Sequence, residues 1–138
     1  MESSTNTKNT TNSANPLLPK LDFSAGSQEL IVEFSGGLEA LIKQEMLKNI
    51  KGAKQSHIKF PKIINKHPAT IQDLIIHLRD FYVKDKPELF CTGDKVRPGI
   101  LVIINEEDWE IVEDNVDKYD YVLGNKDHIL FISTLHGG

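Results

Sequence analysis

The amino-acid sequence predicts an α+β domain in which one main helix packs on one face of a sheet. Three observations lead to this class. Two early segments alternate apolar and polar residues, a middle segment repeats apolar residues at helical spacing, and two late segments are short apolar runs. The resulting order of strand, strand, helix and further strands is typical of α+β proteins.

The first two strands are predicted from alternation. In the segment 28–34, Leu30, Val32 and Phe34 alternate with residues of the opposite face, which is the period-two pattern of a strand. A Ser-Gly-Gly turn follows directly. The segment 55–60 alternates again and predicts the second strand.

The clearest predicted element is a helix from Thr70 to Val83. Thr70 is a favourable N-cap residue, and Asp73 stands three residues later, close to the pattern of a capping box. The helix is expected to end before Pro87, because proline cannot continue it and the lysines ahead of it favour a helix C-terminus. Its apolar residues form one stripe: Ile71, Leu74, Ile75, Leu78, Phe81 and Tyr82.

One face of the sheet is expected to remain available for a partner. The late strands, Ile100–Ile104 and His128–Thr134, are apolar on both faces, and a single helix covers only one face. The segment from Leu38 to Ile50 has near-helical spacing and predicts a short helix or a decorated loop. The alternative is that this segment forms a second helix and covers the remaining face.

Alternation assigns the side chains of the last strand to the two faces. Phe131 is the better core filler, so Ile129 and Phe131 are expected to point toward the helix. Leu130 and Ile132 then point away from it. Together with Val102 of the preceding strand, these two residues make up the predicted partner surface.

Composition sets the class of protein. The 138 residues, 39% hydrophobic and 26% charged, predict a single soluble domain with one core. A net charge of −4 argues against direct nucleic-acid or membrane-surface binding, and no apolar run approaches the roughly 20 residues of a membrane span. One cysteine makes no internal disulfide, and the N-terminus has no signal-peptide pattern. The expected location is therefore the cytoplasm or the nucleus.

The two ends of the chain are expected to be tails. Residues 1–27 begin with a stretch rich in Ser, Thr and Asn, which cannot bury enough apolar surface to offset the entropy of ordering. They are predicted to be a disordered polar tail, followed by a folded domain over residues 28–138. That domain ends in a flexible Gly137-Gly138 tail.

The Gly-Gly end indicates chemistry at the chain terminus. Without Cβ atoms, Gly137 and Gly138 make a thin, flexible segment that passes where a side chain would clash. This suits a carboxylate that is threaded into the active site of another protein. An α-carboxylate titrates near pH 3.5, so at neutral pH it is ionised and is a poor acyl donor until it is activated.

The other candidates for chemistry are weaker. Cys91 has no clear cationic partner in the sequence and is interpreted as an inert thiol, and the five histidines show no metal-ligand spacing. The segment 105–125 carries eight acidic residues and one lysine, but it lacks the glycine and final glutamate of a calcium loop. It is interpreted as a solvated acidic face that could steer docking onto a basic partner. No phosphate loop or catalytic triad order is present, so the chain is not expected to be an enzyme.

Several blocks of this sequence together resemble the ubiquitin-related modifier 1 family, within the β-grasp, ubiquitin-like superfamily. The resemblance spans about Leu30 to Gly138, and two features depart from it: the polar N-terminal tail and extra residues around 44–55. The blocks that carry it are Gly36-Gly37-Leu38, Gly93-Asp94, Val96-Arg97-Pro98-Gly99-Ile100, Ile104-Asn105, Asp108-Trp109-Glu110 and Phe131 to Gly138.

The resemblance implies a mixed β-grasp sheet and the role of a sulfur carrier. An activating enzyme with a rhodanese-type domain would use ATP to adenylate Gly138 and then convert it to a thiocarboxylate. A separate tRNA thiolase complex would pass the sulfur to the wobble uridine of tRNA. The resemblance also implies covalent attachment of Gly138 to lysines of target proteins such as peroxiredoxin-type proteins, and no bound cofactor. Leu135, His136 and Gly137 would be the recognised tail.

A second hypothesis remains open. The chain could be a β-grasp interaction module that binds partners non-covalently through its exposed sheet face, with incidental terminal glycines.

Overall fold

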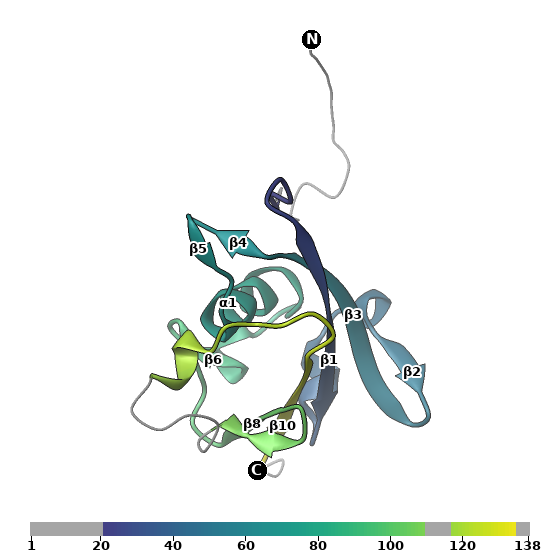
Figure 1. The fold of residues 1–138 in the computed structure, drawn as a ribbon. Coiled ribbons are helices and arrows are strands. Elements are labelled where there is room, and N and C mark those ends of the chain that lie inside the picture. Colours follow the sequence, from purple (N-terminus) through teal and green to yellow (C-terminus); the bar gives the residue numbers. More distant parts are fainter. Residues whose placement is uncertain (1–20, 110–116, 135–138) are drawn as a thin grey trace, which may run out of the picture.

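The computed structural model describes residues 21–109 and 117–134. Their backbone forms a six-stranded sheet in the order β2-β3-β1-β10-β8-β9, with helix α1 on one side of it (Figure 1). The two central strands, β1 and β10, run parallel, whereas the other neighbouring pairs are antiparallel. The predicted α+β class with a mixed sheet and one main helix is therefore confirmed. The strands are β1 (Ser27–Ser35), β2 (Lys48–Ile50), β3 (Ala53–Pro61), β8 (Ile100–Ile104), β9 (Glu107–Asp108) and β10 (His128–Ser133).

Helix α1 (Ile71–Phe81) begins at the predicted N-cap. The Thr70 amide donates to Asp73 Oδ2 over 2.9 Å, and the Asp73 amide donates to Thr70 Oγ1 over 3.4 Å, which completes a capping box. The stripe residues Ile71, Leu74, Ile75 and Leu78 are fully buried against the sheet. The helix ends two residues before the predicted end, and its existence and its buried face are confirmed.

The segment between β1 and β2 is not a helix. It consists of two short 3-10 turns, η1 (Leu38–Leu41) and η2 (Gln44–Met46), and the following residues Lys48–Ile50 pair with β3 as strand β2. Tertiary hydrogen bonds explain the difference from helical spacing. The Lys43 amide donates to the Tyr82 carbonyl and the Lys84 amide donates to the Leu41 carbonyl, both over 2.9 Å, so the backbone here is bonded to the end of α1. The alternative of a second helix over this segment is wrong, and the decorated loop is the correct interpretation.

The core lies between α1 and the sheet and contains a cluster of three aromatic rings. Phe34 of β1 stacks on Phe131 of β10 with ring centroids 5.8 Å apart, and Phe90 meets Phe131 edge-on at 5.3 Å. All three rings are at most 2% exposed. Phe90 follows the 3-10 turn η3 (Pro87–Leu89), so this contact ties the chain after α1 to the central strands.

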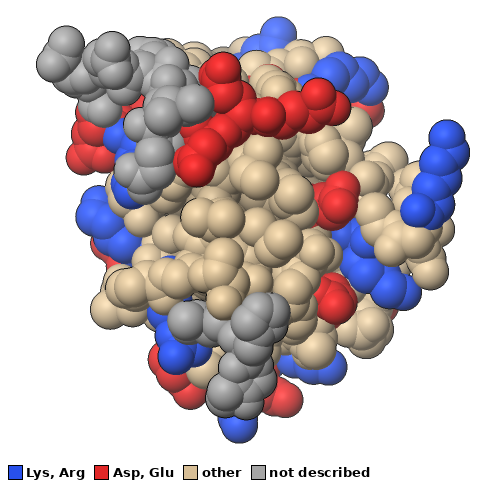
Figure 2. All heavy atoms as spheres, turned by 90° about the horizontal axis from the view of Figure 1, so that it is seen from below, with Lys and Arg blue, Asp and Glu red and all other residues tan. Residues whose placement is uncertain are grey.

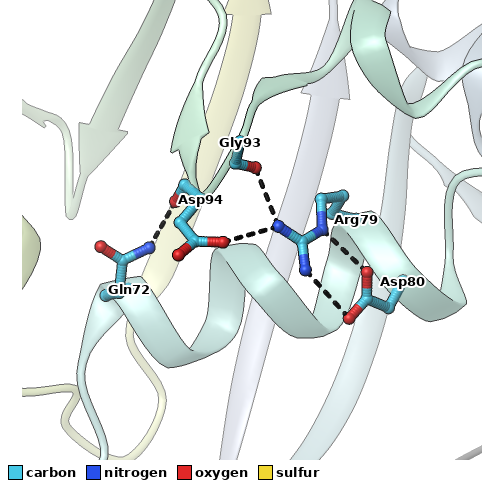
Figure 3. A network of polar contacts seen from close by, with 5 residues as sticks. All are labelled: Gln72, Arg79, Asp80, Gly93 and Asp94. Carbon is cyan, nitrogen blue, oxygen red and sulfur yellow. Dashed lines mark hydrogen bonds and ion pairs between the residues drawn. The ribbon is translucent and has the colours of Figure 1, made fainter.

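The described fold also contains the 3-10 turn η5 (Lys118–Asp120) and two short hairpins, β4 (Ile63–Ile64) with β5 (His67–Pro68) and β6 (Cys91–Thr92) with β7 (Lys95–Val96). Figure 3 shows how the second hairpin is fastened to α1. The Arg79 guanidinium donates to the Gly93 carbonyl and to the Asp94 carboxylate, both over 2.8 Å, while Gln72 Nε2 donates to the Asp94 carbonyl. The hairpin leads into the turn 97–99, so this network also helps to place the start of β8.

The predicted N-terminal tail lies mostly outside the described residues. From Leu21 onward the chain contacts the domain ahead of the predicted boundary at residue 27. The Lys62 amide donates to the Gly26 carbonyl over 3.1 Å, and the Lys59 ammonium lies 4.6 Å from the centre of the Phe23 ring.

Candidate functional site

The candidate site begins where strand β10 ends. β10 lies between β1 and β8, with Phe131 opposite Phe34 on one side and opposite Val102 on the other. A strand with neighbours on both sides is the most firmly held kind of strand in a sheet. The four predicted tail residues, Leu135, His136, Gly137 and Gly138, lie outside the described residues, and the last described residue is Thr134.

Two turns flank the end of β10. On the β8 side, the Thr134 amide and hydroxyl both donate to the Gly99 carbonyl, over 2.9 and 2.7 Å. On the β1 side, Gly36 lies so close that a Cβ atom placed on it would be 2.5 Å from the Ser133 carbonyl oxygen. The final residues of the strand are thus in contact with backbone on both sides.

The outer face of the sheet, away from α1, carries the predicted partner residues Leu130 and Ile132. Both are half-buried, whereas Ile129 and Phe131 are fully buried in the core. The predicted assignment of the last strand to the two faces is therefore confirmed.

The prediction for Val102 is wrong, because this residue is fully buried. Val102 stands opposite Phe131, and directly opposed residues of an antiparallel pair lie on the same face of the sheet. The outward residues of β8 are instead its neighbours Leu101, which is 41% exposed, and Ile103. We call Leu101, Ile103, Leu130 and Ile132 the outer patch.

The patch residues make two cross-strand pairs, Leu130 with Ile103 and Ile132 with Leu101. Seen from below in Figure 1, the side of the molecule at β8 and β10 has an uncharged centre, and acidic and basic side chains lie toward its rim (Figure 2). An apolar centre with a charged rim is the composition of a protein–protein interface.

The two edges of the sheet carry opposite charge. The segment 43–67, which contains β2 and β3, has seven lysines and one acidic residue. At the other edge, β9 and the turn before it contribute Glu106, Glu107 and Asp108. Only part of the predicted acidic segment 105–125 is described, and within it β9 pairs with β8, next to the outer patch.

A chain of polar contacts separates the basic edge from the outer patch. His128 Nε2 lies 3.0 Å from Glu33 Oε1, and Gln55 Nε2 donates to the same oxygen over 3.2 Å. His57 Nε2 in turn lies 3.2 Å from Gln55 Oε1. These four side chains come from three adjacent strands, so they extend across the sheet face on the β1 and β3 side of the patch.

The remaining candidates stay separate from this face. Cys91 is buried, and burial raises the pKa of its thiol to about 11, although the nearby Arg79 opposes the shift. Such a thiol has little thiolate at neutral pH, which agrees with its interpretation as inert. In residues 21–109 and 117–134 no group of three or more His, Cys, Asp or Glu side chains is arranged to hold a metal ion. In the same residues, no helix is long and apolar enough to span a membrane.

Sequence reasoning missed four residues that this site depends on: Leu101, Ile103, Gly36 and Gly99. The first two follow from the register of β8 against β10, which the sequence does not reveal. Gly36 stands in the Ser-Gly-Gly turn that the sequence indicated, and Gly99 stands in one of the blocks that carry the family resemblance. The contacts of both glycines with the end of β10 join segments far apart in the chain.

A mixed sheet with two parallel central strands and one helix on its inner face defines a ubiquitin-like β-grasp protein. More specifically, the family model described as Urm1 (Ubiquitin related modifier) matches residues 29–138. The chain belongs to this family of ubiquitin-like modifiers, which are not catalytic enzymes.

Individual relatives agree with the family match. Ubiquitin-related modifier 1 of mouse and that of human are each 43% identical to this chain over 107 residues, covering 78% of this chain and 92% of theirs. The solution structure of Urm1 from Trypanosoma brucei superposes with a TM-score of 0.57 at 33% identity, covering 81% of this chain and 97% of that chain. The crystal structure of an Rurm1-related protein from Plasmodium yoelii gives a TM-score of 0.58 at 26% identity, covering 79% and 99%.

Proposed function

We propose that this chain is a sulfur carrier that acts through the carboxylate of Gly138. The observation that carries the proposal is the extent of the family match, which runs through the tail to Gly138 rather than ending with the sheet. The position of β10 supports it, because the strand that leads to the tail is bonded on both sides. Covalent attachment of Gly138 to lysines of target proteins, such as peroxiredoxin-type proteins, uses the same carboxylate and belongs to the same proposal.

The chemistry divides between this chain and an activating enzyme. A Gly138 carboxylate oxygen attacks the α-phosphorus of ATP and displaces pyrophosphate, which makes an acyl adenylate. The outer sulfur of a persulfide on a rhodanese-type domain then attacks the acyl carbon, AMP leaves, and an acyl disulfide forms. A second thiolate of the enzyme attacks the sulfur that belongs to the domain, so the S–S bond breaks, an enzyme disulfide forms and Gly138 is released as a thiocarboxylate. Sulfur suits this step because it is strongly nucleophilic at neutral pH. The resulting thiocarboxylate is the donor for a tRNA thiolase complex, and this chain itself holds no cofactor.

The outer patch is the proposed docking surface for the activating enzyme. Leu101, the most exposed patch residue, and its neighbours supply an apolar centre. The basic edge at β2 and β3 and the acidic edge at β9 lie on opposite sides of it, so a partner with complementary charges is oriented as it approaches. Docking places the end of β10 beside the enzyme, and the tail then enters the active site. The proposed location is the cytoplasm or the nucleus.

The intact mass of the protein purified from its own cells tests this function. A sulfur carrier shows a fraction in which sulfur replaces one oxygen at Gly138, and alkylation of the thiocarboxylate shifts the mass of that fraction alone. Protein from cells that lack the activating enzyme is the control and shows the carboxylate form only. If the modified fraction is absent from wild-type cells and no lysine-linked conjugates form, the non-covalent interaction module is the correct reading.

A further inference from the structure

The end of β10 makes one hydrogen bond more than its pairing with β8 requires. Thr134 lies one residue beyond the strand, yet its amide and its hydroxyl converge on the same acceptor, the Gly99 carbonyl oxygen, over 2.9 and 2.7 Å. The amide contact continues the ladder between β10 and β8. The hydroxyl contact adds a second bond, which ties the side chain of Thr134, the last described residue, to the turn 97–99.

Gly36 makes the matching contact on the other side. β1 and β10 run in parallel, with Ser35 opposite Ile132, which brings Gly36 beside Ser133. A Cβ atom on Gly36 would lie 2.5 Å from the Ser133 carbonyl oxygen and 3.0 Å from its amide nitrogen. Both are backbone atoms, so a side chain at position 36 would force the turn at Gly36 and the end of β10 apart. The adjacent Gly37 also has a positive φ, 104°, but a Cβ on it would meet nothing within 4 Å.

These contacts lie within a short reach of the proposed reacting group. Gly138 is four residues beyond Thr134, and a fully extended chain spans at most about 3.6 Å per residue. The Gly138 Cα atom is therefore at most roughly 14 Å from the Thr134 Cα atom. Over so few residues, the direction in which the chain leaves Thr134 restricts where the carboxylate can go.

We propose that Thr134 and Gly36 are positioning residues that set the direction in which the tail leaves β10 toward the active site of the activating enzyme. The inference rests on the proposed function, since it concerns delivery of Gly138 for adenylation. On the β1 side, Gly36 has no side chain and lets the backbone of Ser133 lie close to it. On the β8 side, the Thr134 hydroxyl is hydrogen-bonded to Gly99. The role of both residues is to position the tail and not to take part in the reaction. Because they restrict the tail before it binds, the tail loses less conformational entropy when it enters the enzyme.

This role predicts different effects on KM and on kcat. The outer patch determines how tightly the folded domain docks, and therefore contributes to KM. The direction of the tail determines what fraction of docked complexes has the carboxylate in place, and therefore contributes to kcat. A change that loosens the chain exit should lower kcat, whereas a change in the outer patch should raise KM.

The test uses the full chain, ATP and its cognate activating enzyme, with adenylation measured by ATP–pyrophosphate exchange. Thr134→Val keeps the branched shape and the amide bond to Gly99 but removes the hydroxyl. It should lower kcat about fivefold, as expected for one net hydrogen bond, with little change in KM and a fall in melting temperature of at most about 4 °C. Thr134→Ser keeps the hydroxyl and should retain the wild-type kcat. Leu130→Lys should show the opposite pattern, with a raised KM and a retained kcat.

Gly36→Ala and Gly37→Ala form a second pair. Both place alanine at a positive φ, 71° and 104°, so both carry backbone strain, but only the change at Gly36 pushes against Ser133. Gly36→Ala should therefore lower kcat well below the value of Gly37→Ala. The comparison is made at a temperature at which circular dichroism shows both variants folded.

The outcomes separate this inference from the function on which it rests. If the wild-type chain is not adenylated, the proposed function fails. If wild type is adenylated and Thr134→Val matches it in kcat, the positioning role is refuted while the function stands. A Thr134→Ser variant as impaired as Thr134→Val, or a Thr134→Val effect confined to KM, also refutes the role, because the hydroxyl contact would then not be directing the tail.

Discussion

Asp127, a buried carboxylate that precedes β10, provides a quantitative test of how the central strand is anchored at its beginning. Its Oδ2 atom accepts hydrogen bonds from the Tyr121 hydroxyl over 2.9 Å and from the Gly124 amide over 2.8 Å. Its Oδ1 atom accepts one from Asn105 Nδ2 over 2.9 Å. Asp127 is 8% exposed, so water cannot readily replace these donors.

Replacing Asp127 by asparagine keeps the shape but converts one acceptor into a donor. The least costly orientation turns the new NH2 group toward Asn105, where two donors then face each other. Asn105 cannot rotate its amide freely, because its Oδ1 atom accepts from the His128 amide over 2.9 Å. One bond to a charged acceptor is lost and a buried donor is left without a partner, which costs about 2–3 kcal/mol. For a domain of this size that loss lowers the melting temperature by roughly 10 °C.

Urea unfolding followed by circular dichroism measures this loss. Asp85→Asn is the matched control, because it removes the same charge from an exposed position and should change the free energy of unfolding by less than about 0.5 kcal/mol. If Asp127→Asn were no more destabilising than Asp85→Asn, the three contacts would not be anchoring the start of β10.

Three further predictions concern His77, Cys91 and the outer patch. Burial among Phe60, Phe81 and Tyr82 lowers the pKa of His77, so below about pH 6.5 the unfolded chain binds the proton more readily than the folded chain, and the free energy of unfolding falls as the pH decreases. Urea unfolding at several pH values should show a smaller pH dependence for His77→Phe than for wild type. An unchanged pH dependence would show that His77 is not the group responsible. Because burial raises the pKa of the Cys91 thiol to about 11, iodoacetamide at pH 8 should label native protein far more slowly than urea-unfolded protein, and equal rates would show an accessible thiolate. Leu130→Lys should raise the KM for adenylation about tenfold with the fold intact. The control Val122→Lys changes an exposed apolar residue outside the patch and should leave KM unchanged. Equal effects of the two variants would exclude the patch as the docking surface.

The parts of the fold that local patterns determine were predictable from the sequence. The Thr70 and Asp73 capping box acts over three residues, and the stripe of α1 is a property of one helix, so both could be read directly. The same holds for alternation in β10, where Phe131 faces the core and Leu130 faces outward. In each case the information lies within one element.

The parts that depend on distant segments were not predictable. Whether Val102 or Leu101 faces outward depends on the register of β8 against β10, which is a property of the pair. The segment 38–50 has helical spacing, but hydrogen bonds to the end of α1 replace those that a helix would make. The contact of Asp127 with Asn105 joins residues more than 20 positions apart, and that of Gly36 with Ser133 joins residues nearly 100 apart; no local pattern indicates such partners.

The central claim is that Gly138 carries the reacting carboxylate, and its most direct measurement is ATP–pyrophosphate exchange with the cognate activating enzyme. Three chains are compared: wild type, a chain without Gly138, and a chain with one alanine added after Gly138. The account predicts exchange with wild type only and equal melting temperatures for all three, because the change lies beyond the last residue of β10. Exchange at the wild-type rate with either altered chain would contradict it.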